Sequence, residues 1–310
     1  MTAEQAPEQA TEPMTEHALQ YASQTEAPTN AAATEAPMSA ASTEAPASAP
    51  TETATEAGAS ISIDTATGQE APAELSKERV KKIFTDIAWD YERFNALSSF
   101  GQYRSWLRTL IDLAPITPHS RLLDVAGGTG DVAFMACERK QPASIVLSDY
   151  TPAMLEVAQK RLDDGEAHGV PVELAVVDGQ DIPYDDESFD VVTVSYGIRN
   201  MPEREKALAE MYRVLVPGGS LCVLEFSTPP NPLMRLGYNL YLRYGIPAWG
   251  KIVTGDSSGF VYLAKSIRAF PNQQRFCRML KDAGFNRVDY KNVTGGVAAV
   301  HIACKDANDA

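Results

Sequence analysis

The chain has 310 residues with 27 basic and 41 acidic side chains, which gives a formal net charge of −14. Residues 1–76 hold twelve acidic side chains and no Lys or Arg, so they carry −12 of that charge and the rest only −2. A near-neutral remainder without a basic stripe excludes nucleic acid as the expected partner. Four scattered cysteines and four scattered histidines exclude a metal site with ordinary ligand spacing.

The first 76 residues differ in composition from the rest. They are rich in Ala, Thr, Glu and Pro, and the tetrapeptide Thr-Glu-Ala-Pro recurs at 25, 34 and 43. This composition predicts a disordered acidic tail, followed by one folded domain at 77–310. No basic segment followed by an apolar run opens the chain, and no apolar stretch approaches 18 residues. We therefore expect a cytoplasmic protein without a membrane span.

Strand and helix patterns alternate along the folded part. Apolar spacing predicts helices at 77–94, 101–113, 131–139, 152–163, 203–215 and 271–283, and strands at 121–126, 144–149, 172–177, 189–195, 220–226, 286–293 and 297–304. This alternation predicts an α/β fold, with a mostly parallel seven-stranded sheet and helices on both faces. Pro217-Gly218-Gly219 is expected to turn the chain before the fifth strand. Gly295-Gly296 is expected to turn a final hairpin, which makes the last strands antiparallel.

The most informative segment is 122–131, where an apolar strand leads into three glycines within four residues, Gly127, Gly128 and Gly130. Glycines let a ligand approach the main chain, so the segment predicts a nucleotide-cofactor loop. The G-x-G-x-x-G spacing of dinucleotide folds and the Lys-Ser/Thr pair of P-loops are both missing. Asp124 at the strand end suits a ligand with an ammonium and a sulfonium group. These features predict S-adenosyl-L-methionine, with a purely structural glycine turn as the alternative.

Residues that follow the other strands are the remaining cofactor candidates, because ligands of open α/β sheets bind outside the carboxyl ends of strands. Asp149 ends the second strand, roughly 20 residues past the glycines, where a ribose-binding carboxylate falls. Asp178, with Gly179, follows the third strand and is expected near an adenine amino group. The alternative role of Asp178 is an ordinary turn or helix-cap acid. Ser195 ends the fourth strand.

With these residues in place, the chain resembles class I methyltransferases of Rossmann-like fold, and more closely the ubiquinone/menaquinone biosynthesis C-methyltransferase family. The glycine loop and the Pro-Gly-Gly turn are shared by many methyltransferases, whereas the Gly-Ile-Arg-Asn segment at 197–200 is specific to this family. The resemblance extends from about residue 80 to 305, and is carried by 88–91 with Asn95, 99–101, 123–131, 195–200, 211–219, 224–227 and 289–301.

The resemblance implies cofactor contacts at the glycine loop with Gly128 and Thr129, at Asp149, at Asp178-Gly179 and at Ser195. One position departs from the family pattern, because many relatives carry Asn-Ala where this chain has Asp178-Gly179. The resemblance also implies the substrate, a polyprenylated quinol. We expect demethylmenaquinol, methylated in the last step of menaquinone biosynthesis. The alternative is the 2-polyprenyl-6-methoxy-benzoquinol precursor of ubiquinone, and the sequence does not rigorously separate the two.

Carbon methylation of a quinol requires an electron-rich ring, which develops as a hydroxyl loses its proton. No histidine lies at a strand end to act as a base. Arg199 is the candidate to stabilise phenolate character, with Asn200 and Tyr91 orienting the ring. The alternative is that Arg199 and Asn200 only shape a loop through backbone carbonyls. Glu225 is a further candidate for proton handling, or else a solvated strand-end acid.

An apolar insertion at about 230–270 separates the fifth strand from the last helix. It is expected to be a lid over the quinone head, a peripheral contact with the cytoplasmic face of the membrane, or a helical pair packed on the sheet edge. The rival functions are a small-molecule O- or N-methyltransferase and a noncatalytic cofactor-binding scaffold. The insertion and the Gly-Ile-Arg-Asn segment argue against the first rival, and the intact cofactor loop argues against the second.

Overall fold

The computed structural model describes residues 101–248 and 258–307, together with Lys81, Lys82, Thr85, Asn95 and Ser99. The predicted tail at 1–76, Tyr91 and most of the helix predicted for 77–94 lie outside the described residues. The boundary between residues 76 and 77 therefore stays a prediction.

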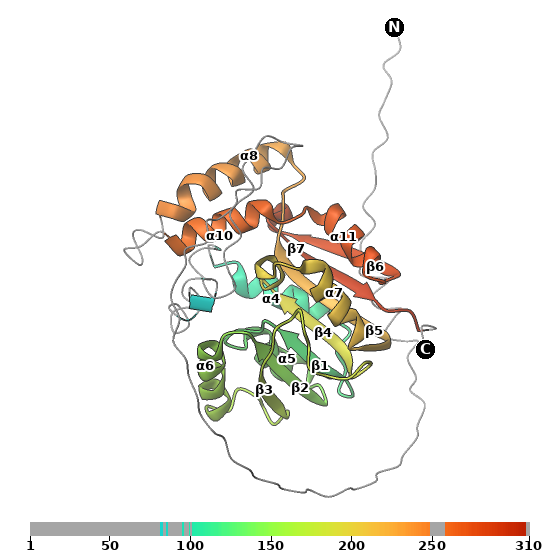
Figure 1. Cartoon of the computed structure of the whole chain (residues 1–310). Coiled ribbons are helices and arrows are strands. Elements are labelled where there is room, and N and C mark those ends of the chain that lie inside the picture. Colours follow the sequence, from blue (N-terminus) through green and yellow to red (C-terminus); the bar gives the residue numbers. More distant parts are fainter. Residues whose placement is uncertain are drawn as a thin grey trace, which may run out of the picture. The chain divides into compact units, whose positions relative to one another are not determined.

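The described strands form one seven-stranded sheet in the order β3-β2-β1-β4-β5-β7-β6 (Figure 1). Strand β7 is antiparallel to β5 and β6, and the other neighbours are parallel. The predicted α/β fold is thus confirmed. Chain order reverses between β1 and β4, so the carboxyl ends of these central strands form the crevice where ligands bind in such sheets. The strands are β1 (Arg121–Val125), β2 (Ser144–Asp149), β3 (Val172–Val176), β4 (Phe189–Ser195), β5 (Leu215–Phe226), β6 (Arg287–Val293) and β7 (Ala298–Cys304).

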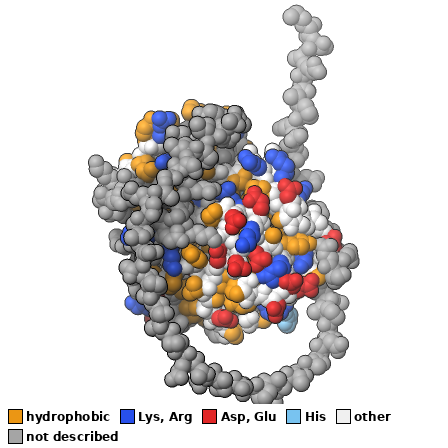
Figure 2. All heavy atoms as spheres, in the orientation of Figure 1, with side chains coloured by type: hydrophobic (Ala, Val, Ile, Leu, Met, Phe, Trp, Pro, Cys, Tyr) orange, Lys and Arg blue, Asp and Glu red, His pale blue; other side chains and the backbone are white. Residues whose placement is uncertain are grey.

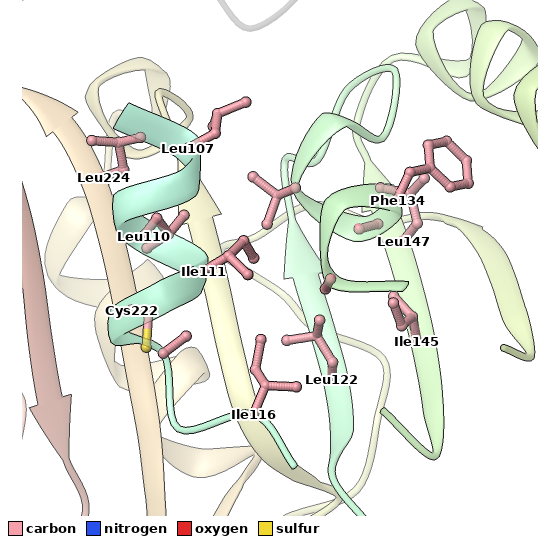
Figure 3. Close-up of a cluster of buried hydrophobic side chains, with 14 of the residues drawn as sticks. Leu107, Leu110, Ile111, Ile116, Leu122, Phe134, Ile145, Leu147, Cys222 and Leu224 are labelled. Atoms are coloured by element: carbon pink, nitrogen blue, oxygen red, sulfur yellow. The ribbon is translucent and has the colours of Figure 1, made fainter. Parts of the chain in front are cut away.

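Helices cover both faces of this sheet. Helices α4 (Tyr103–Leu113), α5 (Asp131–Lys140) and α6 (Pro152–Asp163) pack on one face, and α7 (Arg204–Arg213) and α11 (Gln273–Asp282) on the other. Figure 3 shows part of the first core, where apolar side chains of α4 lie beside those of β1 and β5. Each fully buried Leu or Ile of this kind contributes roughly 1.5–3 kcal/mol.

The start of β5 differs from the prediction. Helix α7 ends at Arg213 and the strand begins at Leu215, which pairs with Phe189 before the register shifts and Ser220 pairs with Val191. The Pro-Gly-Gly segment is therefore an irregularity inside β5, and not a turn before it. Its last glycine is required by space, because a Cβ at Gly219 would lie 2.8 Å from the carbonyl oxygen of Val216.

The final hairpin forms as predicted. Strands β6 and β7 pair from Arg287 with Cys304 to Val293 with Ala298, and the short 3₁₀ turn η4 (Thr294–Gly296) connects them. Its two glycines have φ of 64° and 92°, in the left-handed region that favours glycine.

The insertion between β5 and α11 forms helical segments. They are α8 (Pro232–Leu240), the π-helical turn η3 (Tyr241–Gly245) and α10 (Ser258–Ala269), while residues 249–257 lie outside the described part. Asn231 begins α8, since its side chain accepts the amide hydrogens of Leu233 and Met234. The segments share a small core that reaches Phe226 at the carboxyl end of β5. No helix among the described residues is long and apolar enough to cross a membrane.

Candidate cofactor and acceptor site

An open cavity with about 750 Å³ of empty space lies at the carboxyl ends of β1, β2, β3 and β4. The structure brings five of the six predicted cofactor residues together in its wall, namely Gly128, Asp149, Asp178, Gly179 and Ser195. Asn200, predicted on the acceptor side, lines the same cavity, and the wall is completed by Lys81, Ala126, Tyr150, Thr151, Met154, Val177, Gln180, Tyr196, Gly197, Met201 and Pro202.

Asp149 is held rigidly at the end of β2. One carboxylate oxygen accepts the amide hydrogen of Gly128 at 3.0 Å, and the other accepts that of Thr151 at 2.8 Å. Burial raises the pKa of Asp149 to about 6, although these two hydrogen bonds favour its charged form. A fixed carboxylate that also borders the cavity has the geometry to accept ligand hydroxyls.

Thr129 differs from the other predicted contacts. Its side chain is buried, and among the described residues its hydroxyl has no hydrogen-bond partner, but it is not part of the cavity wall. Its carbonyl oxygen accepts a hydrogen bond from Arg161 at 3.0 Å. The structure therefore gives Thr129 a structural role, because its carbonyl anchors the glycine loop to Arg161.

Asp124, which the sequence suggested as a partner for a ligand ammonium or sulfonium group, is not part of the cavity wall. Its carboxyl is fully buried and accepts the hydroxyl hydrogen of Thr193 at 2.7 Å. The glycine loop covers it, because a Cβ at Gly127 would approach its other oxygen to 2.6 Å. Burial raises the pKa of Asp124 to about 7. The expectation that Asp124 meets a ligand ammonium is corrected: this acid supports the loop from below.

Asp178 and Gly179 form a tight turn after β3. One oxygen of Asp178 accepts hydrogen bonds from the backbone and side-chain nitrogens of Gln180, at 3.0 and 3.1 Å. A Cβ at Gly179 would lie 2.8 Å from Met201 and 2.9 Å from Val125. The turn role left open for Asp178 is thus real, and it coexists with a place in the cavity wall.

The wall fits a polar cofactor on two observations. The hydroxyl of Ser195 is buried and has no hydrogen-bond partner among the described residues, although Ser195 borders the cavity. Ala126 and Tyr196, which follow β1 and β4, have φ of 52° and 56°, in the left-handed region. Such strain is of order 1–3 kcal/mol per residue and is commonly found at functional sites. A ligand that bonds Ser195 would satisfy an otherwise orphaned polar atom.

The acceptor side contains a buried ion pair. Arg199, on the 3₁₀ turn η2 (Ile198–Asn200), donates a hydrogen bond to Glu225 at 2.8 Å, and the two side chains are 6% and 0% exposed. The guanidinium also donates to the carbonyl of Tyr196 and lies over the rings of Tyr196 and Phe226. Burial raises the pKa of Glu225, and Arg199 opposes that shift. Glu225 is therefore no solvated loop acid. Arg199 itself is not part of the cavity wall, although Tyr196, which it contacts, and its chain neighbour Asn200 are.

Arg161 of α6 is a supporting residue that the sequence did not reveal. It donates to the carbonyl of Thr129 and, at 2.8 Å, to Asp131 in the first turn of α5. The second oxygen of Asp131 accepts the phenol hydrogen of Tyr103 at 3.0 Å. Three helices thus converge on the glycine loop. In the sequence, Arg161 is only a cation in the last turn of a helix, which is common and carries no signal of this contact.

Known proteins share sequence and fold with this chain. A model of the ubiE/COQ5 methyltransferase family matches residues 73–305. The ubiquinone/menaquinone biosynthesis C-methyltransferase UbiE of Francisella tularensis subsp. novicida is 41% identical, over 76% of this chain and 94% of the relative. UbiE of Dinoroseobacter shibae is 45% identical, over 73% and 90%. A Thermotoga maritima methyltransferase structure, described as a possible histamine N-methyltransferase, shares the fold, with TM-score 0.51 and 23% identity over 73% of this chain and 99% of that one.

Proposed function

Since the chain belongs to the ubiE/COQ5 methyltransferase family, we propose that it methylates a ring carbon of a polyprenylated quinol. This membership confirms the resemblance expected from the sequence, and with it S-adenosylmethionine as the methyl donor. We propose demethylmenaquinol as the acceptor. The benzoquinol precursor of ubiquinone is the second candidate, because the names of the relatives cover both pathways.

The observation that carries the proposal is that cofactor and acceptor candidates line one cavity. Cofactor candidates Gly128, Asp149 and Ser195 border the same cavity as Asn200, whose chain neighbour is the buried Arg199. S-adenosylmethionine, when bound, supplies a methyl group that its sulfonium already activates. The protein then has to hold the acceptor carbon in line and keep water out, and such positioning contributes roughly 7–11 kcal/mol.

Each chain residue has a proposed part. Asp149 accepts the ribose hydroxyls, and Ser195 with the turn at Asp178 completes the cofactor wall. Arg199 stabilises negative charge on the acceptor oxygen as the quinol becomes phenolate-like, since its guanidinium stays protonated at every relevant pH. Asn200 orients the ring. Tyr91, proposed to help in this, lies outside the described residues.

Peripheral membrane contact is proposed for the insertion. Leu233, Leu236, Leu240 and Tyr244 follow one another at helical spacing and are 79%, 59%, 51% and 61% exposed. Asp256 is the single acidic residue in the sequence at 227–281, whereas the same stretch contains eight Lys and Arg residues. Figure 2 shows hydrophobic and basic side chains side by side where α8 lies. An apolar stripe flanked by cations suits an anionic bilayer surface, where a polyprenyl chain resides.

The proposal is tested by methyl transfer from labelled S-adenosylmethionine to three acceptors. These are chemically reduced demethylmenaquinone, the reduced ubiquinone precursor and a polar catechol. We expect product from the naphthoquinol. Product from the benzoquinol alone would reassign the pathway, and product from the catechol alone would make the protein a small-molecule methyltransferase.

A further inference from the structure

One contact links the insertion to the acceptor side of the cavity. The phenol of Tyr262, on α10, donates a hydrogen bond to the side-chain oxygen of Asn200 at 3.0 Å. Asn200 ends η2 and borders the cavity, whereas Tyr262 lies 62 residues later in the chain. The helix that carries Tyr262 therefore contacts the segment that carries the proposed acceptor residues.

This contact determines which way the Asn200 amide faces. The oxygen of Asn200 accepts from Tyr262, while its nitrogen donates to the carbonyl of Tyr196 at 3.3 Å. Rotating the amide by 180° would place its NH₂ group against a phenol and its oxygen against a carbonyl. A side-chain amide has two donors and two acceptor positions. With one of each engaged, the remaining N–H and lone pair have a fixed direction.

The environment of Tyr262 keeps its phenol in the donor form. Burial raises the pKa of Tyr262 above its ordinary value, and the nearby Glu225 acts in the same direction, while Arg199 and Arg204 oppose it. The phenol is therefore protonated at neutral pH, and the Asn200 oxygen is the acceptor it meets. The hydroxyl also interacts electrostatically with both members of the Arg199–Glu225 pair.

We propose that Tyr262 is a positioning residue, which acts through Asn200 to fix the orientation of a quinol-type acceptor. The inference deepens the proposed function and rests on it. The insertion then has a role beyond covering apolar surface, because the seating of α10 sets the hydrogen-bonding pattern of the acceptor wall. S-adenosylmethionine binding does not depend on this contact, since Asp149 and Gly128 are held by other bonds.

Tyr262→Phe tests the proposal, because it keeps the ring and removes only the hydroxyl. A lost hydrogen bond of this kind predicts a drop in kcat/KM for the quinol of about three- to tenfold. The dissociation constant for S-adenosylmethionine is expected to stay within about twofold. Tyr184→Phe is the matched control, because it removes a phenol bonded to Glu173 at 3.2 Å, away from the cavity wall. Its kcat/KM is expected to be unchanged.

A double-mutant cycle separates positioning from a general packing effect. In an Asn200→Ala background, adding Tyr262→Phe is expected to cause no further loss, because the two residues act as one unit. An equal loss in both backgrounds, an equal loss of S-adenosylmethionine affinity, or no loss at all would overturn the proposal. Failure of the proposed function itself is seen separately, as absent methyl transfer by the wild-type protein. In that case the variants can still be compared by their affinity for oxidised demethylmenaquinone in the presence of S-adenosylhomocysteine, measured by fluorescence. Equal affinities for wild type and Tyr262→Phe would overturn the proposal.

Discussion

The buried pair of Arg199 and Glu225 gives a prediction in which stability and activity separate. Arg199→Met leaves the fully buried carboxylate of Glu225 without the cation 2.8 Å away. Removal of one partner from a buried ion pair costs about 3–5 kcal/mol. Domains of this size have a total stability of about 5–15 kcal/mol, so this single variant should be severely destabilised. The loss should shrink as the pH falls, because burial already raises the pKa of Glu225 and protonation removes its charge.

The double variant Arg199→Met, Glu225→Met should fold normally. Replacing both members of a buried pair with apolar side chains is commonly neutral or stabilising, so its free energy of unfolding should lie within about 1 kcal/mol of wild type or above it. Its methyl transfer should nevertheless fall by about 10²–10³, the effect of removing one preorganised donor to a developing oxyanion. Urea unfolding followed by circular dichroism, at pH 8 and pH 6, measures the first quantity, and labelled methyl transfer measures the second.

Two results would refute this reasoning. A single variant within 1 kcal/mol of wild type would mean that water or rearrangement solvates Glu225 without its partner. A well-folded double variant with full turnover would mean that Arg199 only shapes the loop, the alternative that the sequence left open.

Three further predictions concern the cofactor wall and the core. Asp149 accepts hydroxyl hydrogen bonds most strongly when its carboxylate is charged, and its pKa is about 6, so S-adenosylmethionine affinity measured by calorimetry should be about tenfold weaker at pH 5 than at pH 7.5, and Asp149→Asn should bind weakly at both. Arg161→Gln removes the bonds to the Thr129 carbonyl and Asp131, so it should weaken S-adenosylmethionine binding by roughly tenfold while the KM for the quinol changes little. Burial lowers the pKa of His301 from 6.5 to about 4. Above pH 6.5 the imidazole is neutral in the folded and unfolded states, so it does not lower the free energy of unfolding, but about 3 kcal/mol of that free energy is lost as the pH falls to 4. Unfolding curves of His301→Phe should lack this loss.

Each of these has an opposing outcome. Equal cofactor affinity at pH 5 and pH 7.5 would remove Asp149 as the titrating ligand group. A change confined to the quinol KM in Arg161→Gln would place that residue on the acceptor side. Parallel pH curves for wild type and His301→Phe would mean that the imidazole is solvated in the folded protein. Asp124, whose raised pKa makes its contribution fall as the pH rises, is present in both proteins and cancels from their difference.

Much of the fold follows from local pattern. The strands β1, β2, β4 and β7 are apolar runs of five to seven residues, and their predicted bounds agree with the structure within one residue. The start of β5 differs from its predicted position, because Leu215 is a strand residue only through its pairing with Phe189. That pairing is a tertiary contact, and the Pro-Gly-Gly segment beside it has the local signature of a turn.

For the site as well, some residues could be predicted from the local sequence, whereas others depend on long-range contacts. Asp149, Asp178 and Ser195 could be predicted because the carboxyl ends of parallel strands meet at one edge of the sheet. Whether Asp124 faces the cavity or the core could not, since this depends on how the glycine loop folds over it. The contacts of Arg161 with Asp131 and of Tyr262 with Asn200 span 30 and 62 residues. No periodicity within a helix encodes such long-range bonds.

The position of the transferred methyl group distinguishes carbon methylation of a quinol from the rival reactions most directly. The protein would be incubated with ¹³C-methyl S-adenosylmethionine and demethylmenaquinone, either reduced or oxidised, and the product analysed by NMR. We expect the label on a ring carbon, in a product formed from the reduced quinol only. A label on oxygen, or no transfer to the reduced quinol by protein that binds S-adenosylmethionine, would contradict this proposal.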